Sequence, residues 1–291
     1  MIAVYGKVIN EQNARVFQNL LGILSRAGVD ILIYKTLYDS LTSLPEPVGR
    51  IAGTFSGRDD LHPATRFLIS VGGDGTLLNS INIVRDSGIA VAGVNIGRLG
   101  FLANITETDF QESIENLLAG KLPVEERTLI HATVHGQPAD SFPYALNDVV
   151  IHKSAAGLIT VHTWSNDEFL NSYWADGLIV STPTGSSAYS LSVGGPIVAP
   201  ESQTFIISPI AAHNLNVRPL IIPDHVTLRL KTECRDKDRR FTLSLDSRSV
   251  KCTGGAEIEL KRADFKIRIV KSASFYATLR NKLMWGVDKR N

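Results

Sequence analysis

The sequence is poor in the features that mark several large classes of protein. Its 291 residues include only two cysteines, Cys234 and Cys252, which form no C-x-x-C pair. No apolar run approaches the ~20 residues that cross a bilayer, and Ile2–Tyr5 is too short for the core of a signal peptide. We therefore expect a reduced, cytoplasmic protein with two unpaired thiols and no membrane association.

An excess of charge of one sign is also missing. The chain has 30 basic and 29 acidic residues, a formal net charge of +1. This balance gives no electrostatic reason to bind nucleic acid or an anionic membrane surface. Internal repeats and low-complexity tracts are absent from the sequence, and 44% of the residues are hydrophobic, enough for a large core or two domains of ordinary size.

The most informative stretch is a glycine loop between an expected strand and an expected helix. The apolar run Phe67–Val71 leads into Gly72-Gly73-Asp74-Gly75-Thr76, after which Leu77, Ile81 and Val84 recur at helical spacing. Glycines let a phosphate approach closely, and the helix start supplies free N–H donors. Because a carboxylate there opposes anion binding, we interpret Asp74 as a base or orienting group for a hydroxyl that attacks phosphorus.

Other interpretations of this loop exist. A plain strand-to-helix turn, capped by Asp74 or Thr76, would have the same pattern. The loop lacks the Lys-Ser/Thr ending of a Walker P-loop and the G-x-G-x-x-G spacing of the common dinucleotide fingerprint. It resembles the signature shared by NAD kinases, diacylglycerol-type lipid kinases and, more loosely, phosphofructokinases, and alone it does not choose among them.

Strand and helix patterns alternate over the first part of the chain. Strands are expected at Ile2–Tyr5, Val29–Tyr34, Phe67–Val71 and Ile89–Val94. Helical spacing covers residues 16–27, 77–84 and 108–120, the last opening with a capping box at Thr108–Gln111, whereas residues 39–60 are expected to form a loop. This alternation predicts a parallel sheet covered by helices.

The pattern changes after Pro123. Short extended runs separated by turn residues follow, at residues 128–135, 144–151, 158–164, 178–181, 226–230 and 265–269. We predict an α/β domain with a parallel sheet over residues 1–124 and a β-rich domain over residues 125–274. A helix within residues 275–291 is expected to pack back on the first domain.

A second dense motif runs from Asp176 to Ser190. The strand Leu178–Ser181 leads into a loop with six hydroxyl side chains, and Tyr189 could stack on a ring. Clustered hydroxyls with glycine suit a polyhydroxylated or phosphorylated ligand. A Ser/Thr-rich turn stabilised by local hydrogen bonds explains the same residues without a ligand.

Five motifs in this order resemble those of the NAD kinase family. They are Gly72–Thr76, Gly93–Leu102, Leu146-Asn147-Asp148-Val149, Asp176–Ser190 with Gly194-Gly195-Pro196, and Pro209–Pro219. The resemblance runs from about residue 68 to the C-terminal helix. The chain has Asp246-Ser247-Arg248 where the family commonly carries Asp-Gly-Gln, and Trp174 where other members often carry Arg.

The resemblance implies an NAD kinase/diacylglycerol kinase-like fold and a reaction. The terminal phosphoryl group of ATP, another nucleoside triphosphate or polyphosphate would pass to the 2′-hydroxyl of the adenosine ribose of NAD, giving NADP. Mg²⁺ or another divalent metal would be required, and no residue is assigned to it. The alternatives are a lipid or sugar kinase with the same loop, or a non-catalytic dinucleotide-binding regulatory protein.

The resemblance also implies roles for individual residues. Asp74 would be catalytic, and the phosphate-binding residues would be Gly72, Gly73, Gly75 and Thr76. The NAD-binding residues would be Asp74, Gly75, Asn147, Asp148, Asp176, Thr182, Thr184, Ser187, Ala188 and Tyr189. The expected partners are small-molecule nucleotides and further copies of the chain, in a tetramer or dimer, because the family counterpart of Asp176 can reach a site across a subunit interface.

Overall fold

The computed structural model describes residues 1–7, 11–41, 51–97, 100–136, 142–154, 157–234 and 240–286. The chain divides into two compact units. The first combines Met1–Glu126 with Ile267–Asn291, and the second is the continuous segment Arg127–Lys266. Among the described residues, no helix combines the length and the hydropathy of a membrane span.

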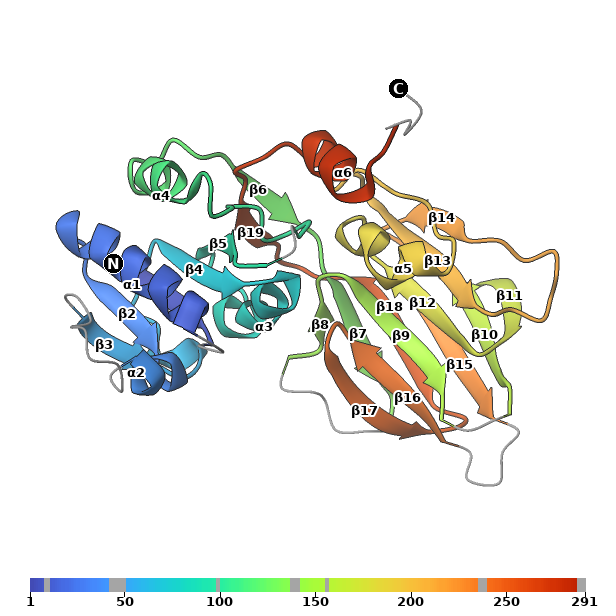
Figure 1. Ribbon diagram of the computed structural model, residues 1–291. Helices are drawn as coiled ribbons and strands as arrows, with labels where there is room; N and C mark the ends of the chain where they lie inside the picture. Colours follow the sequence, from blue (N-terminus) through green and yellow to red (C-terminus); the bar gives the residue numbers. More distant parts are fainter. Residues whose placement is uncertain are drawn as a thin grey trace. The chain divides into compact units, whose positions relative to one another are not determined.

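The first unit is built on a seven-stranded sheet in the order β3-β2-β1-β4-β5-β19-β6 (Figure 1). Its strands are β1 (Ile2–Gly6), β2 (Ile31–Tyr34), β3 (Ile51–Phe55), β4 (Phe67–Gly72), β5 (Ala90–Asn95), β6 (Val124–Arg127) and β19 (Ile267–Val270). The strands from β3 to β19 pair in parallel with their neighbours. All five residues of β1 are buried, as expected of a parallel strand covered on both faces. The expected parallel sheet is confirmed.

Helices accompany this sheet. They are α1 (Glu11–Arg26), α2 (Lys35–Leu41), the short 3₁₀ helix η1 (Arg58–Asp60), α3 (Asp74–Val84), α4 (Phe110–Leu118) and α6 (Phe275–Leu283). In α1 the side chains of Phe17, Leu20 and Leu24 are fully buried at the spacing of one helix face. The helices expected around residues 16–27 and 77–84 are confirmed.

Two local expectations are wrong. Residues 39–60, expected as a loop, contain the end of α2, the edge strand β3 and η1, while residues 42–50 lie outside the described part of the chain. An edge strand with only one neighbour needs little apolar pattern, which explains the weak signal. The capping box at Thr108–Gln111 is not formed, because the Thr108 hydroxyl bonds to that of Thr106 at 2.8 Å and the Gln111 amide donates to Glu115 at 3.0 Å.

Strand β19 lies in the first unit, parallel to β5, and not in the β-rich region where its alternation suggested it (Figure 1). Ile267 and Ile269 are buried and Arg268 is exposed. Alternation of this kind identifies a strand but does not say which sheet it joins. The first unit therefore receives the chain back at residue 267, earlier than the expected boundary at residue 275.

The second unit consists of two six-stranded antiparallel sheets, in the orders β11-β10-β15-β18-β7-β8 and β14-β13-β12-β9-β16-β17. The first sheet contains β7 (Ile130–Val134), β8 (Tyr144–Ala145), β10 (Ile159–Ser165), β11 (Glu168–Ala175), β15 (Leu228–Cys234) and β18 (Glu257–Arg262). The second contains β9 (Asp148–Lys153), β12 (Gly177–Ser181), β13 (Thr204–Ile210), β14 (Leu220–Pro223), β16 (Arg240–Leu245) and β17 (Arg248–Thr253). The 3₁₀ helix η2 (Thr184–Ser187) and the short α5 (Tyr189–Ser192) follow β12.

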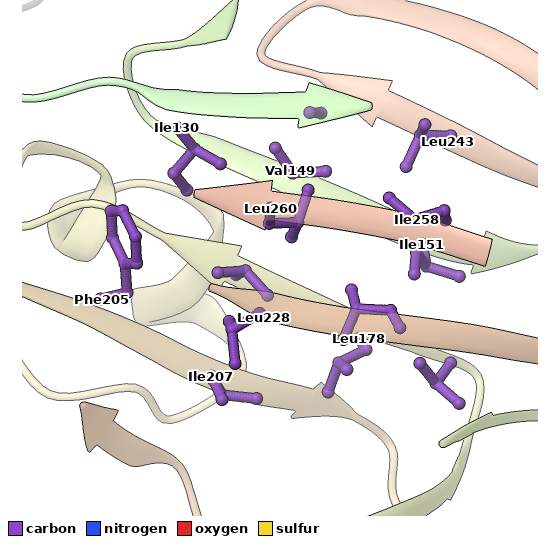
Figure 2. Packing of buried hydrophobic residues seen from close by; sticks show 14 of the residues in the cluster. Ile130, Val149, Ile151, Leu178, Phe205, Ile207, Leu228, Leu243, Ile258 and Leu260 are labelled. Carbon is purple, nitrogen blue, oxygen red and sulfur yellow. The ribbon is translucent and has the colours of Figure 1, made fainter. Parts of the chain in front are cut away.

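Apolar side chains from both sheets of the second unit form one core. Figure 2 shows Ile151, Leu178 and Leu243 of one sheet close to Leu228 and Ile258 of the other. The burial pattern of β15 alternates between buried and more exposed residues, as in a sheet with one face on the core. The β-rich second half is therefore confirmed as a sandwich.

Candidate functional site

The glycine loop joins β4 to α3 within the first unit. A Cβ atom at Gly72 would lie 2.3 Å from Thr76 Oγ1, so the loop closes only with glycine there. A Cβ atom at Gly73 or Gly75 would meet nothing within 4 Å, which means that this side of the loop is open. The first turn of α3 supplies N–H groups to the open side, the arrangement that binds phosphate at helix N-termini.

The Asp74 carboxylate is held by backbone from another part of the first unit. Its Oδ1 accepts from Leu102 N at 3.0 Å and from Ala103 N at 2.9 Å, and its Oδ2 accepts from Phe101 N at 2.8 Å. A Cβ atom at Gly100 would lie 1.9 Å from Oδ1, so only glycine lets the backbone pass this close to the carboxylate. The four-residue segment Gly100–Ala103 therefore fixes the carboxylate in one orientation.

One acceptor position of this carboxylate remains open. A carboxylate has about four lone-pair positions, and backbone N–H groups fill three of them. Lys282 Nζ of α6 lies 3.6 Å from Asp74 Oδ2, an ion pair rather than a hydrogen bond, and 4.5 Å from the centre of the Phe101 ring. The free position on Oδ2 can accept the proton of a substrate hydroxyl.

In the second unit, the Asn147-Asp148 pair is held in the same manner by Asp246. The Asp246 carboxylate accepts from the N–H groups of Leu146, Asn147 and Asp148 at 2.9, 2.7 and 3.3 Å. Asp246 begins the two-residue turn between β16 and β17 and has a φ of 52°, and its own N–H donates to Asp148 O. Through these hydrogen bonds, the β16–β17 hairpin fixes the position of the start of β9.

Burial raises the pKa of both carboxylates of this region, and Asp246 also raises that of Asp148. Burial, followed by repulsion from Asp246, raises the pKa of Asp148 to about 7. The pKa of Asp246 is raised by its own burial, against the opposing effect of its three backbone hydrogen bonds and of Arg248. Asp148 is only 6% exposed, so it titrates close to neutrality in the unliganded protein.

The hydroxyl-rich loop separates into an inward and an outward part. The Thr182 hydroxyl is buried, donates to Leu146 O at 2.6 Å and accepts from Gly185 N at 3.1 Å, while Thr182 N donates to Asn147 O. The hydroxyls of Ser186 and Ser190 are also buried and bonded within the unit. Ser187 and Ala188 are half-buried, Thr184 is largely buried, and Tyr189 is 40% exposed.

The structure brings together some of the site residues expected from the sequence and separates one. Asn147, Asp148 and Thr182 meet where β9 begins and β12 ends, because Ser181 pairs with Asp148 across these strands. Asp176 precedes the other end of β12, ~20 Å from Thr182 along an extended strand, and pairs with Lys153 at 2.6 Å. Within one chain Asp176 therefore does not join this cluster.

Two residues with clear roles were not expected from the sequence. Asp246 lies between two strands with period-two alternation, so a hairpin turn could have been predicted there, but not its bonds to residues almost one hundred positions earlier. Lys282 gives no local signal, because a lysine in the last turn of a helix is ordinary. Arg98 and Leu99 of the second family-like segment, Gly93–Leu102, lie outside the described residues.

Comparisons with known proteins agree with these motifs. The family model described as the ATP-NAD kinase N-terminal domain matches residues 3–122, and the ATP-NAD kinase C-terminal domain matches residues 146–272. The chain is 41% identical over 294 residues to the NAD kinase of Cytophaga hutchinsonii, covering 100% of both sequences. It is 37% identical over 295 residues to that of Bacteroides fragilis, covering 99% of both.

Two solved structures have a similar fold. Yeast NADH kinase complexed with NADH aligns with a TM-score of 0.87 and 22% identity, over 99% of this chain and 88% of that one. An NAD kinase from Archaeoglobus fulgidus in complex with ATP aligns with a TM-score of 0.73 and 22% identity, over 97% of this chain and 98% of that one.

Proposed function

The chain belongs to the NAD kinase family, and from this premise we propose that it transfers the terminal phosphoryl group of ATP to the 2′-hydroxyl of the adenosine ribose of NAD, giving NADP. Phosphoryl transfer proceeds through a loose transition state, so catalysis depends on positioning and on neutralising charge. The observation that carries the residue-level proposal is the fixed Asp74 carboxylate with one open acceptor position beside the glycine loop.

Asp74 acts on the attacking hydroxyl. The 2′-hydroxyl donates its hydrogen to Asp74 Oδ2. The proton passes to the carboxylate as the new P–O bond forms, and the bond from the terminal phosphorus to the leaving oxygen of ADP breaks. The three backbone N–H groups keep the carboxylate from turning away, so the geometry of attack is set before the substrate arrives.

The donor phosphates are bound by the backbone of Gly72, Gly73, Gly75 and Thr76, at the open side of the loop. Across the described ranges, no three His, Cys, Asp or Glu side chains gather in a way that would hold a metal ion. We propose that Mg²⁺ would arrive bound to the donor phosphates, where it would offset their charge.

The acceptor is bound by residues of the second unit. Asn147 and the Asp148 carboxylate suit the hydroxyls of a ribose. Thr184 and the more exposed residues Ser187, Ala188 and Tyr189 suit the rest of the dinucleotide. Thr182 contributes by holding this loop against the Asn147 turn through its buried hydroxyl.

The proposed function is tested by incubating the protein with ATP, Mg²⁺ and NAD and detecting the product with an NADP-specific dehydrogenase. Replacing Asp74 with Asn keeps the shape but removes the proton acceptor, and kcat is expected to fall ~10²–10⁴-fold with little change in NAD affinity. Asp59→Asn, an exposed aspartate of η1, serves as the control.

Wild-type turnover in Asp74→Asn would refute the catalytic role of that residue. Phosphorylation of a lipid or a sugar in place of NAD would support a kinase with another acceptor, and NAD binding without product would support a regulatory dinucleotide-binding protein.

The active form is proposed to be a cytoplasmic homo-oligomer, a tetramer or dimer. Cys234 and Cys252 form no disulfide, as in a reduced protein. The distance of Asp176 from the Asn147 cluster supports a contribution of Asp176 to a site in another copy of the chain.

A further inference from the structure

The first unit contains a cavity at the end of β4 opposite to the glycine loop. Its volume is about 520 Å³, and it is lined by the first residues of β4 and β5, by Arg268 of β19 and by the turn from Arg58 to Arg66. Phe67 and Gly72 are the first and last residues of β4 and lie ~17 Å apart along the strand. The cavity is therefore separate from the residues assigned to phosphoryl transfer.

Positive charge gathers around this cavity. Arg58, Arg66 and Arg268 line it, and no carboxylate residue does. Arg58 is paired with Asp86 at 2.6 Å. Arg268 donates to the carbonyl of Gly88 at 3.0 Å, and Arg66 lies 5.4 Å from the centre of the Phe67 ring. Neither of the last two arginines is paired with a carboxylate of the described chain, so two guanidinium charges remain uncompensated.

A neutral hydrogen-bond donor, the His62 side chain, lines the same cavity. The Thr65 hydroxyl is buried and does not face the open space. The His62 ring accepts from Ala64 N at 3.1 Å through Nδ1, which assigns the hydrogen of the neutral ring to Nε2 and makes that atom a donor.

We propose that this cavity binds a phosphorylated small molecule about the size of a mononucleotide. The planar guanidinium groups of Arg66 and Arg268 match the geometry of a phosphate, and His62 adds a donor for a remaining oxygen. Phe67, Ile89 and Leu122 give an apolar wall for the body of the ligand. A volume of about 520 Å³ is within the usual range for small-molecule sites, and far larger than a single phosphate ion requires.

The test uses uridine 5′-monophosphate as the probe, with uridine and citrate for comparison. Hydrogen exchange followed by mass spectrometry is expected to show slower exchange at residues 58–67 and 87–90 with millimolar uridine 5′-monophosphate, and no change there with uridine. The double variant Arg66→Gln/Arg268→Gln is expected to bind the probe ~100-fold more weakly, about tenfold for each charge-assisted hydrogen bond lost.

Arg66 and Arg268 are exposed, so the double variant is expected to fold, which its thermal unfolding checks. Arg26→Gln, an exposed arginine at the end of α1, is the matched control and should bind like the wild type. Protection confined to residues 72–76, or equal binding by the double variant, would overturn the proposed site. Tighter binding of citrate than of the nucleotide would overturn the phosphate assignment.

Discussion

At the scale of single residues, Lys282 bears most directly on Asp74. Its ammonium group lies 3.6 Å from Asp74 Oδ2 and 4.5 Å from the Phe101 ring, and it is about one-third exposed. An ion pair this exposed adds little to folding stability, typically below ~1 kcal/mol. Its positive charge is nevertheless close to the loop that we assign to the donor phosphates, where negative charge moves during the reaction.

Lys282→Met is therefore expected to lower kcat roughly tenfold while the melting temperature stays nearly constant. Lys282→Arg should retain most of the activity, because it keeps the charge. Arg280→Met removes an exposed charge from the same helix and should behave as the wild type in the coupled assay. Equal activity of Lys282→Met and Arg280→Met would show that the ion pair has no part in the reaction.

Asp148 makes the stability of the unliganded protein depend on pH. Its pKa is about 7 in the folded chain, against 3.8 as the ordinary value. Between these values the folded state holds a proton that the unfolded state has released, so stability falls as pH rises from about 4 to 7 and the loss is complete above pH 7.

Asp148→Asn removes the buried charge. The substitution is therefore expected to raise the free energy of unfolding more at pH 8 than at pH 5, by about 2–3 kcal/mol. Urea unfolding at the two pH values measures this difference, in which pH-independent effects of the substitution cancel. Asp167→Asn, an exposed residue between β10 and β11, is the control and should show no such dependence. A pH-independent effect of Asp148→Asn would contradict the raised pKa.

At the scale of elements, the β16–β17 hairpin holds the start of β9. Asp246→Ala would leave the N–H groups of Leu146, Asn147 and Asp148 without their acceptor and would place alanine at a φ of 52°. Both effects destabilise, and we expect a loss of about 2–4 kcal/mol in the free energy of unfolding.

Asp246→Asn should lose less, because one amide oxygen at the Oδ1 position keeps the bonds to Asn147 and Asp148. Asp264→Ala, an exposed aspartate just before β19, is a control for loss of a surface carboxylate. Denaturant unfolding gives the free energy of unfolding of each of the three variants. If Asp246→Ala is as stable as this control, the hairpin does not hold the Asn147 turn as described.

Elements with a strong local pattern could be predicted from the sequence, and long-range partners could not. The strand over Phe67–Val71, the glycine loop and α3 follow from periodicity and loop composition. Strand β19 joins the first sheet because the chain returns to the first unit after completing the second. No local sequence pattern indicates such a return. For the same reason the backbone N–H groups of Phe101–Ala103, which donate to the Asp74 carboxylate, were not foreseen.

Site residues show the same limit. The motif Asp176–Ser190 indicated a ligand loop, but its sequence does not reveal which hydroxyls point inward. The structure uses those of Thr182, Ser186 and Ser190 for internal hydrogen bonds, as the interpretation of a Ser/Thr-rich turn expected. The outward residues Ser187, Ala188 and Tyr189 remain predictions for the NAD site.

At the scale of the whole molecule, the edge strands β11 and β14 of the second unit each carry two exposed apolar side chains. Phe169 and Trp174 lie on β11, and Leu220 and Ile221 lie on β14, each at one end of its sheet. Uncovered edges with apolar side chains are prone to pair with other chains, so these strands are the expected contacts of the proposed oligomer.

The double variant Phe169→Lys/Ile221→Lys is therefore expected to run as a smaller species than the wild type in light scattering. Val250→Lys adds the same charge at an exposed position on β17, the opposite edge of the sheet that contains β14, and should leave the size unchanged. A wild-type monomer at assay concentration, or equal dissociation by Val250→Lys, would contradict this assignment.

The position of β19 has a consequence for synthesis on the ribosome. The second unit is one continuous stretch, so all of its strands have left the ribosome before the first unit receives β19, its neighbour to β5. At a synthesis rate of ~5–20 residues per second, Arg127–Lys266 take several seconds to make. During this time β5 lacks its neighbour β19. The unit that begins the chain is thus completed last, and the inserted sandwich can form while its host is still unfinished.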